Sequence, residues 1–207
     1  MKRIGLLAAL CVASAVTASN AGAAAPSSQH CTGTIGNVTV TGNLIVPGGA
    51  SCDLEGTIVT GGVAVFPGGN LISRGASIAG SLVAFRAASI AVVGGSSIAG
   101  SANIVGTTGV PSSFGVNAVC QATIGRSLTV VGNLAPVTVG VQPTPGPCGV
   151  SPTVGGNVAV VLNRAQILIS NTSVHGDLYC FHNRPPASGA AGSNAVAGRK
   201  LGECAGL

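Results

Sequence analysis

Charged and aromatic residues are scarce in this chain of 207 residues. Charged side chains make up 6% of it and aromatic side chains 2%, and tryptophan is absent. Only four acidic residues are available for general acid–base chemistry, and the large rings that anchor many interfaces are nearly missing. Beyond the amino-terminal segment, no apolar run approaches the roughly 18 to 20 residues of a membrane-spanning helix. We therefore expect no enzyme, no catalytic residue, no metal, no cofactor and no membrane span in the mature chain.

The amino-terminal segment has the three regions of a secretory signal peptide. Two basic residues precede an apolar run from Ile4 to Val16, and small residues follow. Small residues at positions −1 and −3 permit cleavage after Ala18 or after Ala23. We assign residues 1–23 to a signal peptide and expect the mature protein to be secreted, either extracellular or on the cell surface.

Six cysteines remain in the mature chain, and none of them forms a Cys-x-x-Cys motif of the kind used by metal sites. An even number of cysteines in an exported protein favours disulfides. Neighbours along the sequence are separated by similar spans, which favours three local bridges, each worth about 3 kcal/mol if unstrained. The predicted pairs are Cys31–Cys52, Cys120–Cys148 and Cys180–Cys204.

The middle of the chain is a repeat. Similar lines begin at Gly42, Gly61, Gly80 and Gly100, so the period is 19 or 20 residues. Apolar residues alternate along each line, as is typical of strands rather than helices. Three strand positions recur, and the residues expected to stack on one another are Leu44, Val63, Leu82 and Ala102 in the first, Cys52, Leu71 and Ile90 in the second, and Val59, Ile78 and Ile98 in the third.

Three short strands per line predict one coil of a solenoid. A single coil cannot bury its apolar stripe, whereas stacked coils share a core in which small aliphatic side chains fit better than rings. We predict an all-β, single-stranded, right-handed parallel β-helix over residues 31–182, because the period is not the 18 residues of left-handed hexapeptide helices. The pattern loosens after Gly106, and prolines mark a loop at 141–152. Residues 183–207 are expected to form a flexible segment tethered by the last disulfide.

The export signal, the TIGNVTV and VGGNV lines and the closing LYCFHN and GEC segments together resemble a group of small bacterial secreted proteins that are uncharacterised. These proteins carry repeated G-N-V-x-V lines, and the resemblance, which covers nearly the whole mature chain, implies a parallel β-helix without catalytic residues. A weaker similarity is to bactofilins, which are polymer-forming β-helices. The export signal and the cysteines of this chain depart from them, which argues against a cytoskeletal role.

Asp53 and Glu55 are the only close pair of acidic residues in the sequence. Leu54 between them should point inward, so that both carboxylates point outward about 7 Å apart along one strand. Glycoside hydrolysis uses two carboxylates at such separations. A polysaccharide-active enzyme is therefore the alternative function, although no aromatic platform for a sugar is apparent.

The histidines are the only side chains of this sequence that can act as bases near neutral pH. Asp177 lies two residues after His175, which places both on the same face of a strand, and His182 follows near Cys180. The three side chains form a conceivable metal site but lack the compact spacing of structural zinc sites. A surface ion pair near the last coil is the alternative interpretation.

These patterns favour a structural or binding protein over an enzyme. Removal of Lys2 and Arg3 lowers the net charge from +5 to +3, and the remaining basic residues are scattered along the chain, so no nucleic-acid partner is expected. We expect contacts with an envelope or matrix polysaccharide, or with copies of the protein itself. Because cysteines lie near both ends of the solenoid, we predict capped ends and a monomer.

Overall fold

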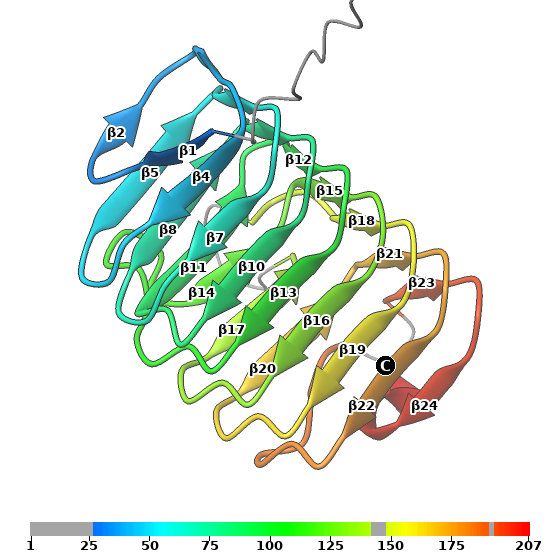
Figure 1. The fold of residues 1–207 in the computed structure, drawn as a ribbon. Helices are drawn as coiled ribbons and strands as arrows, with labels where there is room; N and C mark the ends of the chain where they lie inside the picture. The colour runs from blue at the N-terminus through cyan, green and yellow to red at the C-terminus, as the bar shows by residue number, and fades with distance from the viewer. Residues whose placement is uncertain (1–26, 142–147, 191–192) are drawn as a thin grey trace, which may run out of the picture.

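The computed structural model describes residues 27–141, 148–190 and 193–207, which fold into a parallel β-helix (Figure 1). The signal peptide predicted at 1–23 lies outside the described residues. Each complete coil gives one short strand to each of three sheets, here named A, B and C, and strands of successive coils pair in parallel. The β-helix predicted from the repeat is confirmed.

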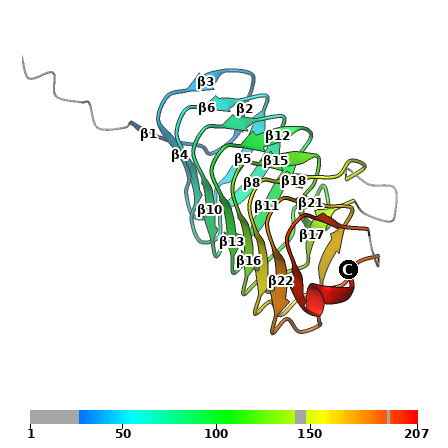
Figure 2. The ribbon, with the colours of Figure 1, turned by 90° about the vertical axis from the view of Figure 1, so that its right-hand side faces the viewer.

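The three sheets form the three sides of the solenoid, and Figure 2 shows the strands of successive coils one behind another. Sheet A has nine strands: β1 (Ser28–His30), β4 (Asn43–Val46), β7 (Val63–Val65), β10 (Leu82–Phe85), β13 (Ala102–Val105), β16 (Leu128–Val131), β19 (Val158–Val161), β22 (Leu178–Phe181) and β24 (Lys200–Gly202). Sheet B has seven strands: β2 (Thr34–Ile35), β5 (Ser51–Glu55), β8 (Asn70–Arg74), β11 (Ser89–Val93), β14 (Asn117–Val119), β17 (Val137–Gly140) and β20 (Ile167–Ser170). Sheet C has eight strands: β3 (Thr39–Val40), β6 (Ile58–Val59), β9 (Ser77–Ile78), β12 (Ser96–Ile98), β15 (Ala122–Ile124), β18 (Thr153–Val154), β21 (Ser173–Val174) and β23 (Ala195–Val196).

The register of the sheets confirms the three predicted ranks of stacked residues. In sheet A, Leu82 pairs with Val63 on one side and Ala102 on the other. Leu71 pairs with both Cys52 and Ile90 in sheet B. The third rank stacks in the same way in sheet C. The repeat therefore specifies which residues face one another across neighbouring coils.

The core is a column of small aliphatic side chains that runs through the interior of the solenoid. Its largest fully buried members are all leucine or isoleucine, as expected for coils that stack about 4.8 Å apart and leave a narrow interior. These residues are Leu44, Leu54, Leu71, Ile78, Leu82, Ile90, Ile98, Ile104, Ile124, Leu128, Ile167 and Ile169.

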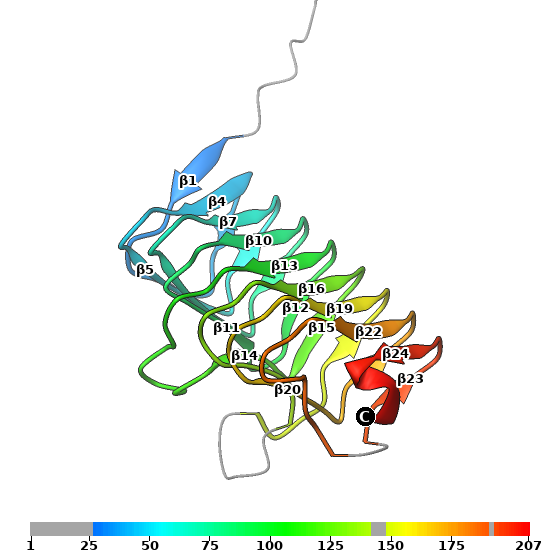
Figure 3. The ribbon, with the colours of Figure 1, turned by 90° about the horizontal axis from the view of Figure 1, so that it is seen from below.

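All three predicted disulfides are present. Cys31–Cys52 joins the first two coils and Cys180–Cys204 joins the last two, and all four of these cysteines are buried in the core. Cys120–Cys148 instead lies in a smaller apolar cluster on the outer face of sheet B. The short 3₁₀ helix η1 (Glu203–Gly206) lies beside the last coil (Figure 3).

The segment 183–207, expected from the sequence to be flexible and tethered by the last disulfide, contains regular structure and carries that disulfide. Strands β23 and β24 pair with β21 and β22 and build a further coil, and η1 follows. The two strands are only two and three residues long, and the surrounding sequence is rich in alanine, proline and glycine, so the alternation that indicates a strand is not visible there. Residues 191–192 lie outside the described residues, as do residues 142–147 of the loop predicted at 141–152.

Candidate functional site

The corner between sheets A and B has an unusual backbone conformation. The residue after each sheet A strand from β10 to β22 adopts positive φ, a backbone conformation that glycine tolerates and other residues adopt at a cost of about 1 kcal/mol or more. Two coils use glycine there, Gly106 and Gly132, but three use Arg86 (φ 49°), Leu162 (φ 59°) and His182 (φ 57°). Three side chains are thus held at strained backbone positions along one corner. Such strained positions are common at functional sites.

A ladder of buried asparagines fixes this corner. Asn133 and Asn163 are fully buried and Asn183 is 3% exposed. The backbone N–H and the side-chain amide of Asn133 both donate to Oδ1 of Asn163, at 2.9 and 2.8 Å. Asn163 donates in the same way to Asn183, at 3.1 and 2.8 Å. Because each amide satisfies the backbone of the preceding coil, the corner is locked from coil to coil.

Both ends of the ladder use a different residue. At its start, the backbone N–H and the hydroxyl of Thr107 donate to Asn133. At its end, Glu203 accepts from the backbone and side chain of Asn183, at 2.9 and 2.7 Å, and from the backbone N–H of Ala187. Burial raises the pKa of Glu203, but these hydrogen bonds and the nearby charge of His182 outweigh it, so the pKa lies below its ordinary value. An ionised carboxylate therefore closes the ladder.

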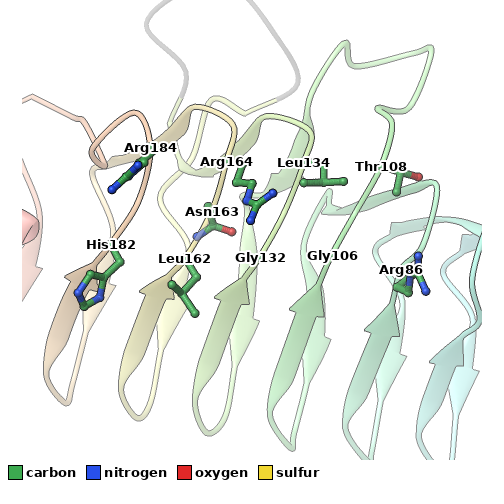
Figure 4. Close-up of a pocket in the computed structure, with 10 residues that line it drawn as sticks. All are labelled: Arg86, Gly106, Thr108, Gly132, Leu134, Leu162, Asn163, Arg164, His182 and Arg184. Carbon is green, nitrogen blue, oxygen red and sulfur yellow. The ribbon is translucent and has the colours of Figure 1, made fainter.

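Basic side chains line a groove of about 830 Å³ beside this ladder, here called the basic groove (Figure 4). The positive-φ residues form one edge, and the residues that follow the ladder position form the other. Arg164 and Arg184 lie on the second edge in adjacent coils, and Arg86 lies three coils away from Arg164, about 14 Å along the solenoid. The lining residues are Arg86, Gly106, Thr108, Gly132, Leu134, Leu162, Asn163, Arg164, His182 and Arg184.

No acidic residue lines the basic groove, although Glu203 lies beside it, next to Asn183 and His182. The other three acidic residues have partners away from the groove. Asp53 and Glu55 pair with Arg74, and Asp177 pairs with Arg199. The fourth acidic residue, Glu203, ends the ladder. Within the described part of the chain, none of the three arginines of the groove forms an ion pair.

The sequence-predicted pair Asp53 and Glu55 lies on β5, as expected, but both side chains turn to the same guanidinium. Arg74 Nη1 contacts Asp53 Oδ2 and lies 3.7 Å from Glu55 Oε1. Glycoside hydrolysis needs one carboxylic acid and one free carboxylate on opposite sides of a bond. Here both carboxylates instead face one cation, Arg74 of the next coil.

The sequence-predicted group of His175, Asp177 and His182 is not brought together. His175 precedes β22 and His182 follows it, so the strand separates the two imidazoles. Asp177 accepts from the backbone N–H of Arg199 at 2.8 Å and from its guanidinium at 3.2 Å, and these two bonds, the backbone bond foremost, lower the pKa of Asp177. Across the described residues, no three histidine, cysteine or acidic side chains are grouped as metal ligands. His182 lies in the basic groove instead.

The arginines of the groove were not identified from the sequence. A signal for them exists, because three successive corners have the form x-Asn-Leu or x-Asn-Arg: GNL at 132–134, LNR at 162–164 and HNR at 182–184. Asparagine recurs at the same position of three successive coils, and an amide at one position of stacked coils can bond to its counterpart in the next coil. The residues on either side of it must then point outward together.

Comparisons with family models, with curated proteins and with solved structures find no match for this chain. Over the described residues, no helix is long and apolar enough to cross a membrane.

Proposed function

We propose that the protein is an exported, non-catalytic β-helix that binds an anionic polymer of the cell envelope or matrix in the basic groove. Three arginines without ion-pair partners along one groove carry the proposal. Arginine is suited to this role because its planar guanidinium binds carboxylate, sulfate or phosphate with two parallel hydrogen bonds.

The shape of the groove supports a polymer rather than a small metabolite. The groove extends over the corners that follow β10 to β22, and its cations are distributed over about 19 Å rather than gathered around one point. A chain of repeating acidic units would meet several of these cations at once. Such multipoint binding gains affinity from effective concentration even if each contact is weak.

Export is supported by two independent features. The amino-terminal segment has the basic and apolar regions of a secretory signal. Three disulfides are typical of proteins in oxidising compartments. An envelope or extracellular matrix is where an exported protein meets acidic polymers.

Binding of fluorescent polygalacturonate and dextran sulfate to the mature protein tests the proposal, with uncharged dextran as the reference. We expect both polyanions to bind at low salt, dextran not to bind, and affinity to fall steeply as salt rises. Replacement of Arg86, Arg164 and Arg184 by glutamine should weaken polyanion binding at least 30-fold. No reducing ends should appear from either polysaccharide.

A matched control separates the groove from the net charge. Arg126 is exposed at the corner between sheets C and A, outside the groove. Arg126→Gln and Arg184→Gln remove the same charge, but only Arg184→Gln should lower the affinity appreciably. Equal effects of these two variants, or unchanged binding by the triple variant, would contradict the proposal.

A further inference from the structure

The aromatic residues of the chain gather next to the basic groove. The sequence holds four phenylalanines and one tyrosine. Phe85 and Phe181 end β10 and β22 and are 52% and 40% exposed, and Phe66, directly after β7, is 48% exposed. Tyr179 lies two residues before Phe181 on the same face of β22, and the two ring centroids are 6.4 Å apart. Four of five aromatic side chains therefore lie on the outer face of sheet A.

These rings belong to a continuous apolar strip. Phe85 pairs with Val105, and the register continues through two further valines to Phe181. Phe66 follows Val65, which pairs with Ala84, so it lies beside Phe85 one coil away. Stacking at about 4.8 Å per coil makes a flat apolar strip about 24 Å long. The strip consists of Phe66, Phe85, Val105, Val131, Val161 and Phe181.

The strip directly borders the basic groove. Arg86 follows Phe85 in the chain, and His182 follows Phe181, so each ring is adjacent to a residue on the edge of the groove. The corner after β22 is the densest point, because Tyr179, Phe181, His182 and Arg184 all come from one coil. An apolar face and a cationic groove thus run side by side along the solenoid axis.

From this juxtaposition we infer that the polymer is an acidic polysaccharide whose sugar rings stack on the strip while its carboxylates meet the arginines. The inference rests on the function proposed above and specifies its ligand. A pyranose ring has an apolar C–H face that packs against both aromatic rings and flat aliphatic surface, so valines between the rings continue the platform. The carboxylate at the edge of each acidic sugar then reaches the neighbouring groove and accepts from a guanidinium.

Charge density favours a polysaccharide over a nucleic acid. A nucleic-acid strand carries one charge about every 3.4 Å, and proteins neutralise it with closely spaced cations. The basic groove offers three arginines over about 19 Å. Such sparse cations suit a polymer with one carboxylate per sugar or per disaccharide. Inorganic polyphosphate has no ring to stack and would leave the strip uncovered.

The double variant Phe85→Ser with Phe181→Ser tests the inference, because both side chains are exposed and their loss leaves the core intact. A polygalacturonate oligomer and a polyphosphate of equal charge are the probes. We expect the variant to bind the oligomer at least tenfold more weakly and to bind polyphosphate as the wild type does. The control is Ile58→Ser, an exposed apolar residue on sheet C, which should change neither affinity.

Salt dependence gives a second readout that separates the two proposals. Loss of the arginines should reduce the slope of log K against log salt, whereas loss of the rings should lower the affinity and leave that slope unchanged. If the arginine variants lose binding but the ring variant binds the oligomer normally, or loses both probes equally, the inference fails and the proposed function stands. Tighter binding of single-stranded DNA than of the oligomer also overturns the inference. If the arginine variants bind as well as the wild type, both proposals fail.

Discussion

The corner between sheets A and B is built in two different ways along the same solenoid. In the first coils it is a Pro-Gly-Gly turn closed by its own backbone, in which Gly69 N–H donates to Phe66 C=O and Gly68 takes positive φ after Pro67. In the later coils the positive-φ residue precedes a buried asparagine that bonds to the next coil. The first corner is closed by its own backbone and bonds to the next coil only through main-chain groups, such as Gly68 N–H to Arg86 C=O, whereas the second is joined to its neighbours by buried side chains.

This difference explains why the groove lies where it does. A Pro-Gly-Gly turn stabilises itself through the fixed φ of proline and the freedom of glycine, but it presents almost no side chain to solvent. An asparagine ladder moves the stabilising bonds into the interior and frees the residues on both sides of the asparagine. The later coils use these positions for Leu162, Arg164, His182 and Arg184. The ladder therefore supports the part of the groove formed by the later coils, whereas Arg86 lies in a coil that has Ala87 at the ladder position.

The largest expected effect is from breaking the ladder in its middle. Asn163→Ala removes the acceptor of Asn133 and the donor to Val130 C=O, and it leaves buried polar groups unsatisfied. We expect the free energy of unfolding to fall by about 3 to 4 kcal/mol in urea titrations. The corresponding change in a Pro-Gly-Gly corner, Pro67→Ala, should cost only about 0.5 to 1 kcal/mol. Similar losses from the two variants would show that the corners do not differ in this way.

Glu203 at the end of the ladder should give the later coils a pH-dependent contribution. Its pKa in the folded protein lies below its ordinary value of 4.5, so the unfolded chain takes up the proton first as the pH falls. This contribution to stability is complete well above pH 4.5, begins to decline as the pH approaches 4.5, and is lost as the pH falls through the lower pKa of the folded state. We expect Glu203→Gln to cost about 1 kcal/mol at pH 7 and to flatten the loss between pH 5 and 3.

Thermal unfolding at several pH values measures this effect. The variant keeps Asp177, whose pKa is also lowered, so part of the acid sensitivity should remain. The difference between wild type and variant isolates Glu203. A difference that does not change between pH 7 and pH 3 would mean that the carboxylate charge does not stabilise the ladder.

The smallest expected effect is at a strained position of the basic groove. Leu162→Gly relieves positive φ but gives the unfolded chain more freedom, so the free energy of unfolding should stay within about 0.5 kcal/mol of the wild type. Thr129→Gly, at an extended position on the outer face of β16, should cost about 1 kcal/mol. If Leu162→Gly lowers the free energy of unfolding more than Thr129→Gly does, packing of the leucine side chain outweighs its backbone strain.

Much of the fold was predictable because a stacked core imposes its own period. The ranks of Leu44, Leu71 and Ile78 and the three disulfides follow from spacing alone. The last coil was missed because very short strands in a composition of small residues carry little alternation. The predicted acid pair is on the expected strand, but sequence spacing does not reveal that Arg74, from the next coil, occupies both carboxylates.

The sequence by itself determined the coil length, the inward residues and the neighbours that stack on one another, since each of these depends on a local periodicity. Only the tertiary structure decided that Arg86, Arg164 and Arg184 share one groove with Phe85 and Phe181 beside it. The reason is physical: stacking brings equal phases of the repeat within about 4.8 Å of each other per coil, however far apart they are in the chain. The insertions between β13 and β18 lengthen two coils, so this phase cannot be counted along the sequence and is set by the hydrogen-bond register of the sheets.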